Sequence, residues 1–301
     1  MTSEPTALSP GGTNAVGRIL GLLGDEWTVL IIQQALLGAT RYGDFMQRLP
    51  ISNTVLANRL RVLADNGVLI RTTYQTRPVR AEYLISQRGR AFWPVLLSIW
   101  EWERRWVSDH VHRLPKMRHT QCGTQFAPVL TCQTCGESVT EKQVSARWGP
   151  SGTWPRSVPD GSNRRRSSTG QAGLFPETMS VFGNRWAAAL LVCTFLGTSR
   201  FSEFQTQLGA PPSLLSERLQ TFCANRVLHS SREANYRLTE KGRAFFPVII
   251  AALQCGQHWF HAPEGPAVLL THLGCGEPFV GQLTCDQCAR PLKGADIGID
   301  D

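Results

Sequence analysis

The chain has 301 residues, a formal net charge of +8 and a hydrophobic fraction of 42%. This length favours two domains, each large enough to bury a core. No apolar run reaches the roughly 18 residues of a membrane span, and the first residues lack the pattern of a secretory signal, which excludes a membrane partner. We therefore expect a cytoplasmic protein whose nine cysteines stay reduced and serve as metal ligands or buried thiols. The basic charge permits a polyanionic partner without requiring one.

The sequence contains the same pattern of residues twice. The segment Gly24–Trp27 returns as Gly183–Trp186, and many later segments return at an offset of 159 residues, then of 153. A repeat of this length indicates a duplicated domain, because solenoid repeats are roughly 20–50 residues long. The residues that the second copy lacks all fall between Leu228 and Tyr236.

Residues 1–13 are small and aperiodic and predict a disordered tail. Apolar residues at helical spacing then predict four helices, which cover residues 17–23, 27–37, 42–48 and 52–66. Pro50 ends the third helix, Ser52 is the N-cap of the fourth, and Gly67 follows its end. Two strands, 68–73 and 79–85, are expected around a turn that contains Pro78. A long helix follows, from Gly89 to about His112.

Residues 141–173 are rich in Pro, Gly and Ser and include the run Arg164-Arg165-Arg166. They predict a flexible basic linker, in which the arginines are either solvated or close to a phosphate backbone. The second copy follows, and the chain ends in a short acidic tail.

The order helix, short helix, turn, helix, hairpin, helix is that of a winged helix–turn–helix. In this fold the helix after the turn, the recognition helix, enters the major groove of DNA. The recognition helix would be Ser52–Asn66, with the wing formed by the two strands after it. The candidate DNA-binding residues lie on the outward face of this helix and on the wing: Ser52, Asn53, Thr54, Asn58, Arg61, Arg71, Arg77 and Arg80. Arg59 is equally suited to an ion pair and to a phosphate contact. The alternative is a winged helix used for protein contacts alone.

Each copy ends in the spacing His-x2-Cys-x9-Cys-x2-Cys. Two pairs of such ligands suit tetrahedral zinc, and four protein ligands leave no open position, so the sites would be structural. We expect two zinc ions, one within each repeat, held by His119, Cys122, Cys132 and Cys135 and by His272, Cys275, Cys285 and Cys288. The alternatives are inert thiols and a redox switch. Cys193, Cys223 and Cys255 are expected in the core.

The first copy resembles the HxlR-type winged helix–turn–helix transcriptional regulators of bacteria, relatives of the MarR group. The resemblance is carried by Leu22–Trp27, Arg41-Tyr42, Leu56–Leu63, the wing segment Arg77–Tyr83, and Pro94–Trp102. It covers about 90 residues of the first copy and about 80 of the second. It implies regulators that bind operator DNA, usually as dimers joined through their terminal helices. A small-molecule effector is a further candidate partner.

The second copy departs from this pattern where DNA would be read. It lacks a counterpart of Arg77–Arg80, begins its recognition helix with Pro211-Pro212, and has Glu217 in place of Asn58. A carboxylate at that position is repelled by DNA phosphates, although it could accept a hydrogen bond from the amino group of a cytosine. We therefore expect the second copy to complete a dimer-like shape and to read DNA weakly or not at all.

Together these patterns predict an α+β, mainly helical fold with two winged helix–turn–helix domains, each followed by a small Cys/His zinc-ribbon-like module. The predicted segments are a tail over 1–13, the first winged helix over 14–113, its module over 114–140, the linker over 141–173, the second winged helix over 174–262, its module over 263–293 and an acidic tail over 294–301.

The expected function is transcriptional regulation through sequence-specific binding of double-stranded DNA, by an intramolecular pseudo-dimer or a homodimer. The alternative is a ligand- or redox-sensing interaction protein whose second winged helix serves dimerisation. No catalytic triad, phosphate-binding loop or open metal site points to an enzyme.

Overall fold

The computed structural model describes residues 4–108, 114–158, 175–183, 185–231 and 235–300. The run Arg164–Arg166 and the predicted end of the long helix near His112 lie outside the described residues. No helix in the described ranges is long and apolar enough to cross a membrane.

The first copy, repeat one, has the predicted order of elements. They are α1 (Ala15–Leu23), α2 (Glu26–Leu36), α3 (Tyr42–Arg48), α4 (Asn53–Asp65), β2 (Leu69–Thr76), β3 (Val79–Ile85), α5 (Gln87–Arg90) and α6 (Trp93–Trp106). The helix starts follow from local capping, because the Asp25 side chain accepts a hydrogen bond from the Thr28 backbone N–H and Ser52 accepts one from Val55.

The second copy, repeat two, repeats this order with a smaller hairpin. Its elements are α8 (Pro176–Phe182), α9 (Arg185–Phe195), α10 (Phe201–Leu208), α11 (Pro212–Ala224), β8 (Leu228–Ser230), β9 (Tyr236–Leu238), α12 (Glu240–Arg243) and α13 (Phe246–Trp259). The antiparallel pair β8–β9 joins Leu228 with Leu238 and Ser230 with Tyr236, whereas β2–β3 extends from Leu69 to Thr76. The residues missing from the sequence of repeat two therefore shorten its wing.

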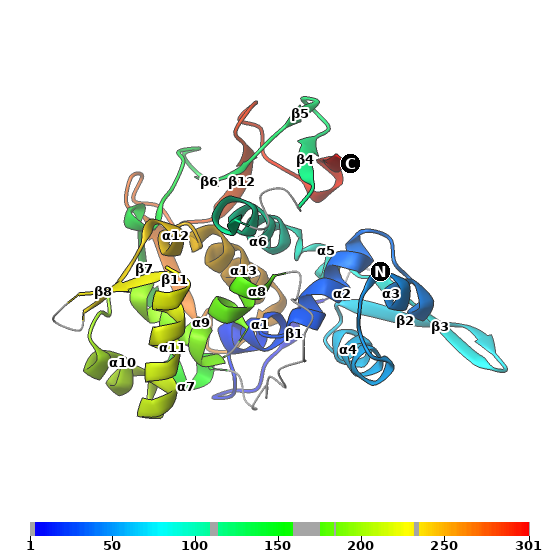
Figure 1. Ribbon diagram of the computed structural model, residues 1–301, viewed down its shortest axis with the longest axis horizontal. Helices are drawn as coiled ribbons and strands as arrows, with labels where there is room; N and C mark the ends of the chain where they lie inside the picture. Colours follow the sequence, from blue (N-terminus) through cyan, green and yellow to red (C-terminus); the bar gives the residue numbers. More distant parts are fainter. Residues whose placement is uncertain (1–3, 109–113, 159–174, 184, 232–234, 301) are drawn as a thin grey trace.

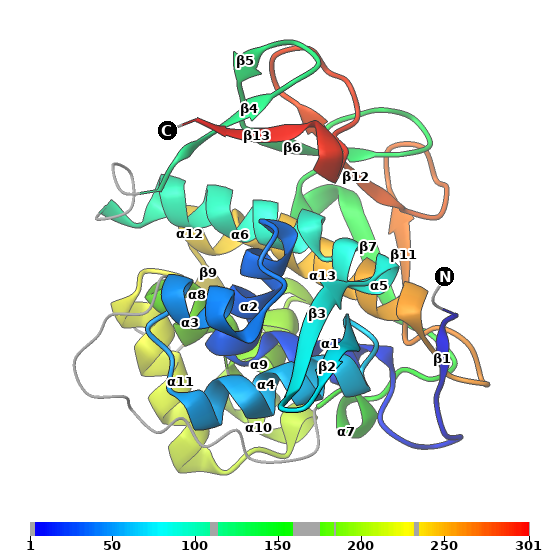
Figure 2. The ribbon, with the colours of Figure 1, turned by 90° about the vertical axis from the view of Figure 1, so that its right-hand side faces the viewer.

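The two repeats pack against each other through their terminal helices. Helices α1 and α6 of repeat one both lie against α13 of repeat two, as Figures 1 and 2 show. A Cβ atom on Gly256 would lie 2.9 Å from the Ala15 carbonyl oxygen, so glycine allows α13 to approach α1 closely. The Trp102 ring meets Phe245 edge-on at 5.1 Å between centroids. One hydrophobic core therefore extends through both repeats.

A buried carboxylate adds polar contacts between the repeats. Glu103 on α6 is fully buried, and its Oε1 accepts hydrogen bonds from the Thr178 backbone N–H at 2.8 Å and from the Thr178 hydroxyl at 2.6 Å. The indole N–H of Trp102 donates to the Lys241 carbonyl at 2.9 Å. These bonds fix the register of α6 against repeat two.

The strands outside the winged helices pair across the repeats. They are β4 (Lys116–His119), β5 (Thr124–Gln125), β6 (Pro128–Cys132), β7 (Val144–Trp148), β11 (Val268–His272), β12 (Gly281–Cys285) and β13 (Ile297–Asp300). Antiparallel pairs form between β6 and β12, between β7 and β11 and between β4 and β13. The expectation of one separate module behind each winged helix is therefore wrong, because each module completes its sheets with strands of the other.

These strands cover a second hydrophobic cluster above α6 and α13. Leu130 of β6 and Leu283 of β12 face each other in the strand register. They pack with Leu97 and Trp100 of α6 and Ile250 of α13. The cluster combines one face of α6, one face of α13 and strands of both modules. Neither module therefore has a complete apolar core of its own.

The predicted disordered tail, flexible linker and acidic tail are each ordered in part. In the predicted linker, a 3-10 turn (Glu141–Gln143), β7 and α7 (Trp154–Ser157) follow one another. Strand β1 (Thr6–Ala7) pairs in parallel with β10 (Phe260–His261), and the acidic end of the chain forms β13. Their strand partners lie far away in the sequence, and local composition does not show such pairing.

The polar contacts of Asn14 explain why the beginning of the predicted linker is ordered. The amide of Asn14, the buried N-cap of α1, donates to the Ser151 carbonyl at 3.0 Å and to the Ser157 hydroxyl at 2.8 Å. Its oxygen accepts from the Gly17 backbone N–H at 3.1 Å. One side chain thus caps α1 and holds α7 against it.

We predict that Glu103→Ala lowers the free energy of unfolding by about 1–3 kcal/mol, because the Thr178 donors lose their buried acceptor. Chemical denaturation with urea measures the change. The exposed carboxylate of Glu217 offers a matched control, and Glu217→Ala should change stability by less than about 0.5 kcal/mol. Equal effects of both substitutions would contradict the role given to Glu103.

Candidate DNA-binding surface and Cys/His clusters

Helix α4 turns one face to the core and the other to solvent. Leu56, Leu60 and Leu63 are completely buried. All predicted DNA-binding residues of this helix and its cap are exposed: Ser52, Asn53, Thr54, Asn58 and Arg61. Spacing by three and four residues separates the two sets, so burial of the leucines presents the polar face to the outside.

Arg59, which suited two roles in the sequence, makes an ion pair within the protein. Its guanidinium lies 2.6 Å from the Asp25 carboxylate, and the two side chains are 26% and 17% exposed. Asp25 also caps α2, so the pair joins the beginning of α2 to α4. A phosphate contact would require Arg59 to leave this partner.

The polar face of α4 is held in place by hydrogen bonds. The Arg61 guanidinium donates to the Asn58 side-chain oxygen at 2.9 Å and lies 3.3 Å from the Asp65 carboxylate. The Tyr42 hydroxyl donates to the Asn53 carbonyl at 2.9 Å and thereby ties α3 to the start of α4. These contacts position the amide and guanidinium groups that could meet base edges.

The wing carries exposed arginines without ion pairs. Arg71, Arg77 and Arg80 are exposed, and none of them has an ion-pair partner among the described residues. The Arg41 guanidinium lies 5.4 Å from the ring centroid of Tyr74 on β2, which adds positive charge beside the hairpin. This hairpin projects away from the rest of the molecule in Figure 1.

The corresponding surface of repeat two has different chemistry. Helix α11 begins with Pro212 after the N-cap Pro211, so no side chain caps it. Glu217, the counterpart of Asn58, is 63% exposed and lies 3.2 Å from Arg218. Helices α4 and α11 lie in the lower half of Figures 1 and 2, whereas β4, β5, β6, β12 and β13 of the Cys/His region lie in the upper part.

The structure brings all eight predicted metal ligands together, but in a different grouping. One cluster consists of His119, Cys122, Cys285 and Cys288, and the other consists of Cys132, Cys135, His272 and Cys275. Each cluster thus takes its His-x2-Cys pair from one repeat and its Cys-x2-Cys pair from the other. The prediction of one complete site within each repeat is wrong, because β6 pairs with β12 and carries Cys132 to the other repeat.

The ligand atoms lie at the spacing of a tetrahedral site. The Nδ1 atom of His119 is 3.5 Å from the Cys122 sulfur and 3.4 Å from the Cys288 sulfur. In the other cluster, His272 Nδ1 is 3.3 Å from Cys275 and 3.4 Å from Cys135. In each cluster, all ligand atoms lie within 4.8 Å of one another.

The backbone around the sulfurs favours thiolates. Gly123, Gly136, Gly276 and Ala289, each one residue after a ligand, have positive φ angles. Such turns direct backbone N–H groups toward sulfur. The N–H of Thr124 lowers the pKa of the Cys122 thiol to about 7. Burial raises the pKa of Cys132, but hydrogen bonds from the N–H groups of Cys135 and Thr134 and from neighbouring thiols together outweigh it, so this pKa is lowered. The pKa values of Cys135 and Cys285 are raised, because burial and the neighbouring thiols outweigh their backbone hydrogen bonds.

The donor set of the clusters fits zinc. Two clusters of three sulfurs and one imidazole nitrogen match a Cys3His site, and thiolates are the form that binds metal. Both histidines are completely buried, and among the described residues their Nε2 atoms have no hydrogen-bond partner, while Nδ1 faces the sulfurs.

The spacing predicts which eight Cys and His residues come together, but not which pairs of them share a cluster. The spacing of the two copies is identical, so either Cys-x2-Cys pair can complete either His-x2-Cys pair. The signal for exchange lies in tertiary structure, in the strand pairs that join the repeats.

The remaining cysteines are core residues. Cys193 and Cys255 are buried, and burial raises the pKa of both thiols, that of Cys255 to about 12. Cys223 is half-buried, and its pKa is also raised by burial.

We predict that Cys193 and Cys255 of the native protein resist a thiol-specific reagent at pH 8, because a thiol whose pKa lies far above the pH forms little thiolate. The thiols of the clusters should react once a chelator is present. Mass spectrometry of labelled peptides identifies the modified residues, and equal labelling of Cys255 and Cys122 would contradict this assignment.

Comparison with known proteins agrees with the helix–turn–helix architecture. The HxlR-like helix-turn-helix family matches residues 22–111 and 181–264, which together make up more than half of the chain. HTH-type transcriptional regulator Rv3095 of Mycobacterium tuberculosis is 34% identical over 136 residues, which cover 45% of this chain and 86% of the relative. YvaP, another HTH-type transcriptional regulator, from Bacillus subtilis, is 34% identical over 91 residues, which cover 30% of this chain and 84% of the relative.

One solved structure adds a weaker likeness. PA1374 of Pseudomonas aeruginosa, described as a candidate transcription factor, has 26% sequence identity and a TM-score of 0.37, over 48% of this chain and 97% of that one. The two family matches, one in each repeat, establish the relationship. The chain belongs to the HxlR-like helix-turn-helix family of transcriptional regulators, with two copies of the family's domain.

Proposed function

We propose that the chain regulates transcription by reading operator DNA with α4 and the β2–β3 wing of repeat one, while repeat two takes the place of a second subunit. The observation that carries this proposal is the wing of repeat one, whose exposed arginines Arg71, Arg77 and Arg80 have no ion-pair partner in the described ranges. Repeat two has a short hairpin in the same position.

The roles of the residues follow from their surroundings. Asn53, Thr54, Asn58 and Arg61 lie on the exposed face of α4, where amides suit adenine and arginine suits guanine. The wing arginines and the cap Ser52 are suited to phosphates, which position the protein without reading sequence. Arg59 is left out of the reading surface, because it pairs with Asp25.

Repeat two would serve as the internal partner of repeat one, which binds DNA in this proposal. Its α13 fills the place beside α1 and α6 that a second subunit would otherwise occupy. With Glu217 facing outward, α11 repels phosphates, so the half-site beneath it would be weakly specified. We therefore expect an asymmetric operator.

We also infer that the two clusters bind zinc as structural sites. The support is the donor set and the spacing of the four ligands in each cluster, which leave no position for a substrate. Because each ion would hold ligands of both repeats, it would join them and limit their relative movement.

For DNA reading, Asn58→Ala should reduce the discrimination between operator and random DNA by about 1–3 kcal/mol, because one base contact is lost. Arg77→Ala should weaken both complexes similarly and lower the slope of log K against log salt by about 1. Fluorescence anisotropy at several salt concentrations measures both effects.

The matched control is Glu217→Ala, at the position of repeat two that corresponds to Asn58. It should leave the affinity unchanged or raise it slightly, because a charge that repels phosphates is removed. A loss of affinity in this variant, with unchanged binding by Asn58→Ala, would assign DNA reading to repeat two.

For the metal sites, the purified protein should contain about two zinc ions. The double variant Cys122→Ser/Cys285→Ser damages a single cluster and should lose about one ion, whereas Cys122→Ser/Cys132→Ser damages both and should lose about two. Elemental analysis after dialysis gives the content. Grouping within each repeat would produce the opposite order, and protein without metal but with normal stability would refute zinc.

A further inference from the structure

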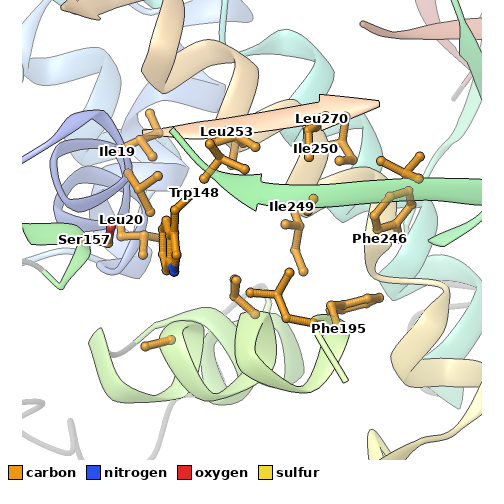
Figure 3. A pocket seen from close by; sticks show the side chains of 18 of the residues that line it. Ile19, Leu20, Trp148, Ser157, Phe195, Phe246, Ile249, Ile250, Leu253 and Leu270 are labelled. Carbon is orange, nitrogen blue, oxygen red and sulfur yellow. The ribbon is translucent and has the colours of Figure 1, made fainter. Parts of the chain in front are cut away.

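A cavity of about 430 Å³ lies between the repeats, on the side of repeat two. Its walls come from α1, α9 and α13 and from the strand pair β7–β11. Figure 3 shows Trp148 beside Ile19 and Leu20 at one end, and Phe195 and Phe246 at the other. Most of the lining is apolar, and the volume lies in the range of small-molecule sites, roughly 300–1,000 Å³.

The duplication shows which residues create this space. Ala189 and Ala252 line the cavity, and the corresponding residues of repeat one are the larger Leu30 and Ile99. Leu30 is 2% exposed and Ile99 is fully buried, so repeat one uses these side chains to fill its core. Val192 in the cavity wall corresponds to Gln33, which makes this wall more apolar than its counterpart.

The cavity opens to solvent beside Trp148, which is 36% exposed, so its apolar walls face water and covering them with a bound molecule is favourable. Repeat one carries the larger residues at the corresponding positions of its own core. The smaller Ala189 and Ala252 leave this space open in repeat two, and a ligand that covers its apolar walls gives the difference a function.

The lining indicates the chemistry of that ligand. The rings of Trp148 and Trp154 meet edge to face at 4.9 Å, and Phe195 lies 5.8 Å from Phe246. Both ends thus offer aromatic surface, which favours a planar aromatic partner.

The charges at the cavity favour a neutral ligand. Glu141 lies 3.7 Å from Arg243, so its charge has a partner. Arg147 is exposed, and water can solvate its charge.

We propose that this cavity binds a neutral, planar aromatic molecule of about two or three rings. The helix α9, which forms one wall, also packs against α10 and α11. The bound molecule would therefore lie one helix away from the helix–turn–helix of repeat two. The proposal is independent of which repeat reads DNA.

The neutral fluorescent probe N-phenyl-1-naphthylamine tests this site in the full-length protein. We expect saturable binding with one site per chain. The double variant Ala189→Leu/Ala252→Ile carries the side chains of repeat one, and it should bind the probe at least tenfold more weakly while its Tm stays equal or rises. The control Ala188→Val also introduces the residue of repeat one, Val29, at a buried position that does not line the cavity. It should bind normally.

If the double variant does not fold, Trp148→Ala provides the second test, because it removes one aromatic end and should also weaken binding at least tenfold. No saturable binding by the natural sequence, or equal binding by the filled variant, would overturn the proposal. If the number of probe sites falls as the protein self-associates, a second copy of the chain occupies the cavity. That result would also overturn the proposal of a small-molecule site.

Discussion

The packing of α13 against α1 and α6 is the interaction on which the rest of the structure depends. It places two winged helices in one molecule with a shared core, and it brings β6 beside β12 and β4 beside β13. Gly256 permits the close approach to α1, and the buried Glu103 fixes the register of α6. Without this packing, neither Cys/His cluster would have its four ligands.

Fusion of the two copies removes a constraint that symmetry imposes on a homodimer. In a symmetric dimer, a change in one subunit appears in the other. In this chain the copies differ independently, so the wing of repeat two is short while that of repeat one is long. For the same reason, repeat two can carry Ala189 and Ala252 at the positions where repeat one carries Leu30 and Ile99. One half can therefore be specialised for DNA and the other for packing or a ligand.

Local signals in the sequence were sufficient for the winged helix of repeat one. Helix α4 begins after its N-cap Ser52 and ends at Asn66, as the capping serine and the glycine after the helix predict. Its leucines face the core. Spacing also identified the eight Cys and His residues that the structure gathers into two clusters, and their binding of a metal stays a prediction. The predicted DNA-binding residues are exposed, and their contacts with DNA stay a prediction.

The errors concern contacts between residues that lie far apart in the sequence. Strand β7 was predicted to be a flexible linker, because five residues with mixed polarity become a strand only beside β11. The ends of the chain have the composition of tails and become strands only through distant partners, β10 for β1 and β4 for β13. The exchange of ligands could not be inferred, because the two copies have the same spacing.

The exchange of ligands also determines when each cluster can be completed during protein synthesis. His119 and Cys122 leave the ribosome more than 150 residues before Cys285 and Cys288, and Cys132 and Cys135 must wait for His272 and Cys275. The nascent first half therefore exposes a His-x2-Cys and a Cys-x2-Cys pair that together have the composition of a complete site. Binding of a metal ion by these four residues would hold β6 away from β12. The native pairing thus has to form in competition with this earlier local pairing, so assembly of the correct clusters is a late step that requires both repeats to have been synthesised.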